Sequence, residues 1–233
     1  MDDLGIHTKD DLELHHQRTR RILSCLQEHG LFLKISKCSF DTPTMEYLGM
    51  IIGQGYVRMD PAKLSTIMDW QPPSSVKGVC SFLGFANFYC KFIPNFSNVV
   101  APIVLLTRKD HPWSWTGPQQ TAFDTLKSIF SSSPVLCIPD VTCPFTLMTN
   151  ASLLAAGAVL MQSDEAGDLH PCAYFSKTFS SAEQNYDIYD QELLAVILAL
   201  VEWKQYLQGT SHPISILTNH KNLSYLKDPR KLS

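Results

Sequence analysis

Three short segments in the second half of the chain most constrain what it can fold into. They are Phe145–Ser152, Tyr189–Ala195 and Ile216–Leu223. The first and third are rich in β-favouring residues and end in polar ones, which predicts two strands that each stop at a turn. The second opens a run with apolar residues at helical spacing, which predicts a long helix. Two strand ends and one helix turn would then meet within a single α/β layer.

The surrounding residues predict the rest of the sheet and the elements before it. Strands are expected at 145–149, 155–162, 172–179 and 214–218, with the long helix at 189–207. Upstream we expect helices at 11–29, 60–70, 74–89, 98–107 and 119–131, a strand at 31–36, and a hairpin of 46–53 and 56–59 turned at Gly53–Gly55. The sequence therefore predicts an α/β (α+β) protein whose second half holds a mixed sheet.

Composition limits the compartment and the partners. The chain has 233 residues, of which 45% are hydrophobic, enough to bury a core in one large domain or two small ones. Its longest apolar runs are far too short to cross a membrane. The seven cysteines form no Cys-x-x-Cys pair and no metal-binding spacing, and the N-terminus is acidic where a signal peptide is basic. These features predict reduced thiols in a cytoplasmic or nuclear protein that is not secreted.

Charge is distributed unevenly along the chain. The net charge is −3, which argues against indiscriminate binding of nucleic acid. Two stretches, 61–109 and 221–233, are nonetheless locally basic. Such stretches suit a protein that contacts phosphates on one face, and they suit an ordinary solvated surface equally well.

Several segments resemble one known family. Phe145–Ser152, Tyr189–Ala195 and Ile216–Leu223 are similar to the ribonuclease H domain of gypsy-class LTR-retrotransposon Pol polyproteins. Tyr47–Gly53 resembles the primer grip of the reverse transcriptase in such polyproteins, and Ser81–Tyr89 resembles its thumb. The family comprises RNA-directed DNA polymerases that also act as ribonucleases on RNA–DNA hybrids.

The resemblance implies three consecutive parts. Residues 1–60 would be a remnant of the reverse transcriptase palm with a primer-grip-like hairpin. Residues 61–140 would be a helical thumb and connection. Residues 141–233 would be an RNase H-like domain shortened at its C-terminal end, because the family has further elements and a fourth ligand beyond this point.

The resemblance also identifies a catalytic centre that is altered in this chain. In the family, the three opening segments carry Asp, Glu and Asp, which hold two Mg²⁺ ions for phosphodiester hydrolysis. Here the matching residues are Asn150, Glu192 and Asn219. We expect the three side chains to cluster and to face one shallow groove. Two of the three charges are missing, so we expect that Mg²⁺, the family's cofactor, is not bound stably.

Further positions follow from the same resemblance. Asp2 and Asp3 match the second half of the polymerase's Tyr-x-Asp-Asp hairpin, where the two aspartates bind metal, and the rest of that site lies upstream in the family. Taken alone, they are also a common solvated terminus. The residues implied to contact nucleic acid are Tyr47, Leu48, Gly49, Lys63, Lys77, Lys91, His220 and Lys221.

Three functions stay open at this point. The first is a reverse transcriptase/ribonuclease H segment that is catalytically inactive on its own. The second is a non-catalytic module that grips an RNA–DNA hybrid or another nucleic-acid backbone. The third is a structural subunit that pairs with the remainder of a reverse transcriptase. None of these three functions requires a membrane.

Overall fold

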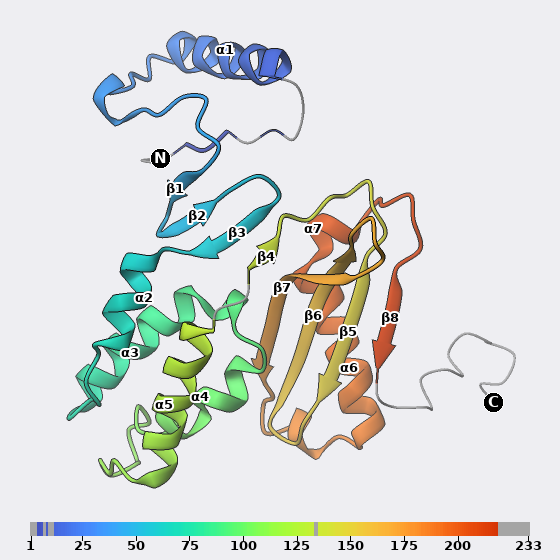
Figure 1. Ribbon diagram of the computed structural model, residues 1–233. Helices are drawn as coiled ribbons and strands as arrows, with labels where there is room; N and C mark the ends of the chain where they lie inside the picture. Colours follow the sequence, from blue (N-terminus) through green and yellow to red (C-terminus); the bar gives the residue numbers. More distant parts are fainter. Residues whose placement is uncertain (1–3, 7, 9–11, 133–134, 219–233) are drawn as a thin grey trace, which may run out of the picture. The chain divides into compact units, whose positions relative to one another are not determined.

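The computed structural model describes residues 4–6, 8, 12–132 and 135–218, which Figure 1 draws in colour. They fall into two compact units, one before Pro61 and one from Pro61 onward. The described residues combine helices with strands in two sheets, which confirms the predicted mixed α/β class. No helix among them is long and apolar enough to cross a membrane.

The first unit holds one long helix, a short 3-10 helix and an antiparallel set of strands. The elements are α1 (Leu12–Glu28), η1 (Ile35–Lys37), β1 (Met45–Tyr47), β2 (Met50–Ile52) and β3 (Tyr56–Met59). β2 pairs with β1 along one edge and with β3 along the other. The strands therefore form a meander with two tight turns, where the sequence predicted one.

The additional turn is at Leu48 and Gly49, inside the predicted strand 46–53. Both residues have positive φ, 50° and 71°, and Tyr47 on one side pairs with Met50 on the other. Two consecutive left-handed residues match the twist of a two-residue hairpin. The prediction was wrong here because leucine seldom adopts a positive φ, so the residue type at position 48 did not indicate a turn.

The predicted strand at 31–36 is also wrong. The segment contains the start of η1 and no strand, and its apolar side chains are exposed, with Phe32 at 93% and Ile35 at 83%. A β-favouring run becomes a strand only when a neighbouring strand accepts its backbone hydrogen bonds. Residues 31–36 have no such neighbour in the described part of the chain.

The second unit begins with a helical part. Its elements are α2 (Pro61–Met68), α3 (Val76–Phe88), η2 (Cys90–Phe92), α4 (Phe96–Leu105) and α5 (Gly117–Ser131). α3 starts at Val76 because Ser75 is its N-cap, and the Ser75 hydroxyl accepts a hydrogen bond from the Gly78 backbone N–H at 3.2 Å. Phe82 packs on Phe123 of α5, with ring centroids 4.8 Å apart. The buried face of α3 consists of Val79, Phe82, Leu83 and Ala86, whereas Phe88 is exposed.

A four-stranded mixed sheet follows. Its order is β7-β6-β5-β8, with β5 and β8 parallel and the other neighbours antiparallel. The predicted long helix is divided in two at Trp203, which is buried and has non-helical dihedral angles. The bounds are β4 (Leu136–Cys137), β5 (Thr146–Ala151), β6 (Ala155–Ser163), β7 (Leu169–Thr178), η3 (Glu183–Asn185), α6 (Ile188–Glu202), α7 (Lys204–Leu207) and β8 (Ser215–Thr218).

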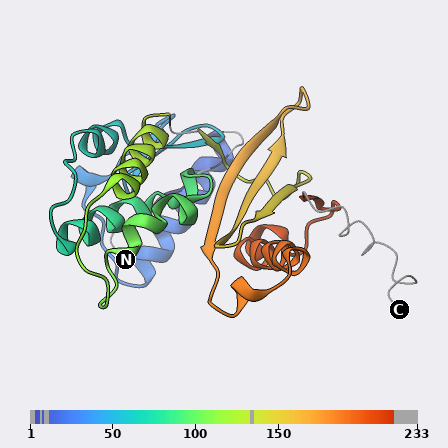
Figure 2. The ribbon, with the colours of Figure 1, turned by 90° about the horizontal axis from the view of Figure 1, so that it is seen from below.

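The two faces of this sheet are covered by different elements, as Figure 2 shows. Alternate residues of β5 are buried beneath α6, where Leu147 and Ala151 pack with Ala199 and Ala195 respectively. The other face meets the start of α4, because the Ser97 N–H donates to the Ser176 hydroxyl at 3.0 Å. We refer to these as the α6 face and the α4 face.

Gly157 permits the close approach on the α4 face. It lies opposite Asn150 in the β5–β6 pair and opposite Ser176 in the β6–β7 pair. A Cβ atom added to Gly157 would lie 2.7 Å from Oδ1 of Asn95, the N-cap residue of α4. A glycine inside a strand often marks this kind of contact.

Leu147→Ala tests the division of β5 into two faces. Leu147 is fully buried against α6, so the truncation should lower the free energy of unfolding by about 2–5 kcal/mol. Met148→Ala is the matched control on the other face, where the side chain is 45% exposed and the loss should be about 0.5 kcal/mol or less. Urea unfolding followed by circular dichroism measures both, and equal losses would contradict the two-face arrangement.

Candidate functional site

Glu192 is the best-defined member of the predicted centre. It lies in α6 near the start of the helix and is only 4% exposed. Its Oε2 atom accepts a hydrogen bond from the Thr218 hydroxyl at 3.3 Å. Thr218 is the last residue of β8, so this contact joins the beginning of α6 to the end of the edge strand.

The start of α6 is held by a second buried polar residue. Gln191 is 1% exposed, and its Nε2 donates to the backbone carbonyls of Glu183 and Gln184, each at 3.2 Å. These bonds fasten α6 to η3, which precedes it. The backbone of Glu192 is thereby fixed from the N-terminal side, while its carboxylate is fixed by Thr218.

Thr149 lies beside this contact. It pairs with Thr218 across the parallel β5–β8 ladder and so projects from the same face of the sheet. It is 2% exposed, and its Oγ1 has no hydrogen-bond partner among the residues that the structure describes. The buried Thr149 and Glu192 and the half-buried Thr218 therefore make up a small polar cluster between the sheet and α6.

Asn150 lies on the other face. Successive residues of a strand point to opposite sides, so Asn150 follows the buried Thr149 onto the α4 face, where it is exposed and opposite Gly157. Asn150 is the second-last residue of β5, and that it faces one groove with Glu192 stays a prediction. Asn219 follows Thr218 directly in the sequence and lies outside the described residues.

Sequence reasoning missed the two threonines, although a signal for them exists. The dipeptide Thr-Asn occurs twice, at Thr149–Asn150 near the end of β5 and at Thr218–Asn219, where Thr218 is the last residue of β8. In parallel strands paired at the two threonines, the repeat places two hydroxyls side by side. Only the packing of α6 shows that one of them reaches a carboxylate.

None of the other predicted site residues that the structure describes belongs to this cluster. Asp2, Asp3, His220 and Lys221 lie outside the described residues. Tyr47, Leu48 and Gly49 form the β1–β2 turn of the first unit, where the Leu48 side chain is 51% exposed. The other three, all exposed, are Lys63 on α2, Lys77 on α3 and Lys91 in η2. Their roles stay predictions.

The donor set does not fit a pair of dications. Two Mg²⁺ ions bring four positive charges and require several hard anionic oxygens. The predicted centre supplies one carboxylate, Glu192, and two neutral amides, Asn150 and Asn219. Within the described ranges, no three His, Cys, Asp or Glu side chains are grouped so that they could hold a metal ion.

Comparison with known proteins agrees with this architecture. Residues 115–216 match the RNase H-like domain found in reverse transcriptase. The Transposon Tf2-3 polyprotein of Schizosaccharomyces pombe is 34% identical over 223 residues, which cover 96% of this chain, and the Tf2-7 polyprotein matches to the same extent. The chain spans 17% of the length of these curated relatives.

The chain belongs to the reverse transcriptase/RNase H-like region of gypsy-class retrotransposon polyproteins. Proteins of this family generally use divalent metals.

Solved structures agree in fold. The foamy viral protease-reverse transcriptase in complex with an RNA/DNA hybrid matches 96% of this chain and 30% of its own, with 22% identity and a TM-score of 0.75. A foamy viral protease-reverse transcriptase in complex with double-stranded DNA matches 93% of this chain and 45% of its own, with 22% identity and a TM-score of 0.73. At this identity the likeness concerns the fold.

Thr218→Val tests the contact that holds Glu192. Valine keeps the β-branched shape but removes the hydroxyl donor, so a buried carboxylate oxygen loses its partner and the free energy of unfolding should fall by about 1–3 kcal/mol. Ser215→Ala, an exposed change in the same strand, should be nearly neutral. Chemical denaturation compares the two variants. An equally small effect of Thr218→Val would show that the contact contributes nothing to stability.

Proposed function

We propose that this chain is a non-catalytic nucleic-acid-binding segment of a retrotransposon reverse transcriptase/RNase H. It binds the backbone of a duplex, such as an RNA–DNA hybrid, and does not hydrolyse it. The observation that carries the proposal is Glu192, a buried carboxylate whose described partner is a threonine hydroxyl, with asparagine at the two other positions of the centre.

The chemistry of the side chains supports the loss of hydrolysis. A two-metal centre offsets the repulsion between its cations with clustered carboxylates. An amide oxygen can coordinate Mg²⁺ but brings no charge. Asparagine is nearly the same shape as aspartate, so the exchange at 150 and 219 removes charge and leaves the strands free to form.

Binding of a nucleic-acid backbone would depend on basic side chains outside the catalytic centre, and the chain has such side chains. Lys63, Lys77 and Lys91 are exposed cations from consecutive elements of the helical part. Proteins that bind phosphate backbones do so largely through such side chains, whatever the base sequence. Two solved structures of similar fold contain an RNA/DNA hybrid or double-stranded DNA, which favours a duplex as the ligand.

Fluorescence anisotropy with a labelled RNA–DNA hybrid tests the binding. Affinity should fall steeply with salt, because each neutralised phosphate releases a counterion. The triple change Lys63→Gln, Lys77→Gln and Lys91→Gln should lower the slope of log affinity against log salt by about 3. A control with the same change in charge replaces Lys37, Lys177 and Lys204 by Gln, all exposed and outside the predicted contacts.

The outcomes separate the candidate functions. A smaller slope in the first triple variant and not in the control supports the proposal. No binding at low salt would contradict it and would favour a structural subunit. Cleavage of the hybrid by the unmodified chain in Mg²⁺ or Mn²⁺ would contradict the loss of hydrolysis.

Restoring charge tests why hydrolysis is absent. Asn150→Asp with Asn219→Asp returns two carboxylates to the family's three positions. Calorimetry should then detect binding of Mg²⁺ or Mn²⁺ that the parent chain does not show, because three carboxylates offset part of the cation repulsion. Adding Glu192→Gln to the double variant should abolish the gain. Equal metal binding by parent and double variant would show that charge is not the missing component.

A further inference from the structure

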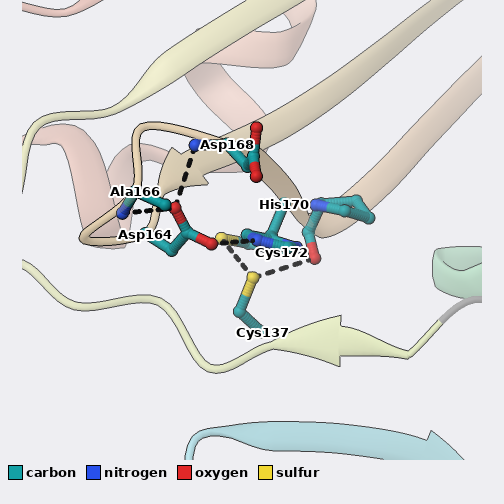
Figure 3. Close-up of polar contacts among 7 residues, drawn as sticks. Cys137, Asp164, Ala166, Asp168, His170 and Cys172 are labelled. Carbon is teal, nitrogen blue, oxygen red and sulfur yellow. Dashed lines mark hydrogen bonds and ion pairs between the residues drawn. The ribbon is translucent and has the colours of Figure 1, made fainter.

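Two cysteines meet where the short strand β4 packs against β7. Their sulfur atoms, Sγ of Cys137 and Sγ of Cys172, are 4.0 Å apart, although 35 positions separate the residues in the sequence. The Cys137 thiol also donates to the Pro171 carbonyl at 3.3 Å. Figure 3 shows both contacts, with the two sulfur atoms facing each other between the strands.

A β-bulge directs Cys172 inward. In the β6–β7 ladder, Met161 pairs with Pro171 and Leu160 pairs with Ala173, so Cys172 is the additional residue. Pro171 has no N–H to give to a ladder, and it lies on an edge strand, where proline is tolerated. The bulge places Cys172 in the core cluster beneath the sheet, with Cys137 packed against it.

The surroundings hold both strands in place. The buried side chain of Gln162 makes two hydrogen bonds to the backbone of Asp140 in the loop after β4. Its Nε2 donates to the Asp140 carbonyl at 2.7 Å, and its Oε1 accepts from the Asp140 N–H at 2.8 Å. At the β6–β7 turn, Asp164 accepts from Nε2 of His170 at 2.9 Å, as Figure 3 also shows. The two thiols therefore lie between segments that are already fixed.

We propose that Cys137 and Cys172 form a modification site, a thiol pair that glutathione disulfide converts into an intrachain disulfide joining β4 to β7. Cys137 is half-buried and accessible to the oxidant, whereas Cys172 is 5% exposed. The sulfur atoms are in van der Waals contact, so side-chain rotation brings them to bonding distance between two strands that already pack together.

The reaction proceeds by two exchanges. The Cys137 thiolate attacks one sulfur of glutathione disulfide, the S–S bond breaks, and one glutathione thiolate leaves and takes a proton. The Cys172 thiolate then attacks Sγ of Cys137 in this mixed disulfide and releases the second glutathione. Two protein thiols are oxidised, and one glutathione disulfide is reduced to two glutathione thiols. Burial raises the pKa of Cys172 well above its usual range, so the second exchange is the slower one.

Peptide mapping identifies the bond. The reduced full chain is incubated with glutathione disulfide, its remaining thiols are alkylated, and it is cleaved before aspartate without reduction. Asp140, Asp164 and Asp168 place Cys137, Cys143 and Cys172 on three separate peptides. Mass spectrometry should find the peptides of Cys137 and Cys172 joined. The midpoint of thermal unfolding should rise by roughly 5–10 °C, because the bond closes a loop of the unfolded chain.

Cysteine-to-serine variants test whether the bond is specific to this pair of thiols. Cys137→Ser should leave Cys172 reduced, because no other thiol is in contact with it among the described residues, and circular dichroism checks that this variant is folded. Cys25→Ser with Cys80→Ser removes two exposed thiols and should leave the bond intact. A glutathione adduct that persists on Cys137 while Cys172 stays reduced would overturn the proposal, and so would a bond from Cys143 to either residue.

Discussion

The packing of α6 against alternate residues of β5 is the constraint on which the rest of the sheet unit depends. Leu147, Thr149 and Ala151 are buried by it, and every second residue between them is turned to the other face. Parallel strands also require a crossover, and α6 lies in the connection that returns the chain to β8. One helix thus fixes the buried face of β5, the position of β8 and the place of Glu192.

This arrangement lets the fold form without charge at position 150. Asn150 is turned away from the α6 face, and Oε2 of Glu192 accepts a hydrogen bond from Thr218. Replacing Asp by Asn at the strand end therefore removes charge without touching the core. Loss of one member of a cluster of like charges can even favour the metal-free fold. A chain of this kind can lose hydrolysis and keep its architecture, which is the sense in which function belongs to sites and not to folds.

The sequence correctly predicted those elements in which the spacing of apolar residues matches the spacing of the buried side chains. β5, β6, α3 and the first part of α6 follow from apolar spacing. The sequence-based prediction failed where the pairing with a neighbouring strand decides whether a segment forms a strand or a turn. The run at 31–36 has the composition of a strand but no partner, and the Leu48–Gly49 turn depends on the pairing of Tyr47 with Met50. The contact between Glu192 and Thr218 joins residues 26 positions apart, so no local pattern could indicate it.

The α4 face limits how a duplex can approach Asn150. The Ser97 N–H is bonded to Ser176 on β7, and the Ser152 hydroxyl donates to Oδ1 of Asn98 at 3.2 Å. Both contacts bring the start of α4 onto the end of the sheet where β5 stops. A nucleic acid that reaches Asn150 on this face must therefore pass alongside the helical part of the same unit, whose exposed cations include Lys91 just before α4. In the proposed function, Lys91 and Asn150 would then contact the same nucleic-acid backbone.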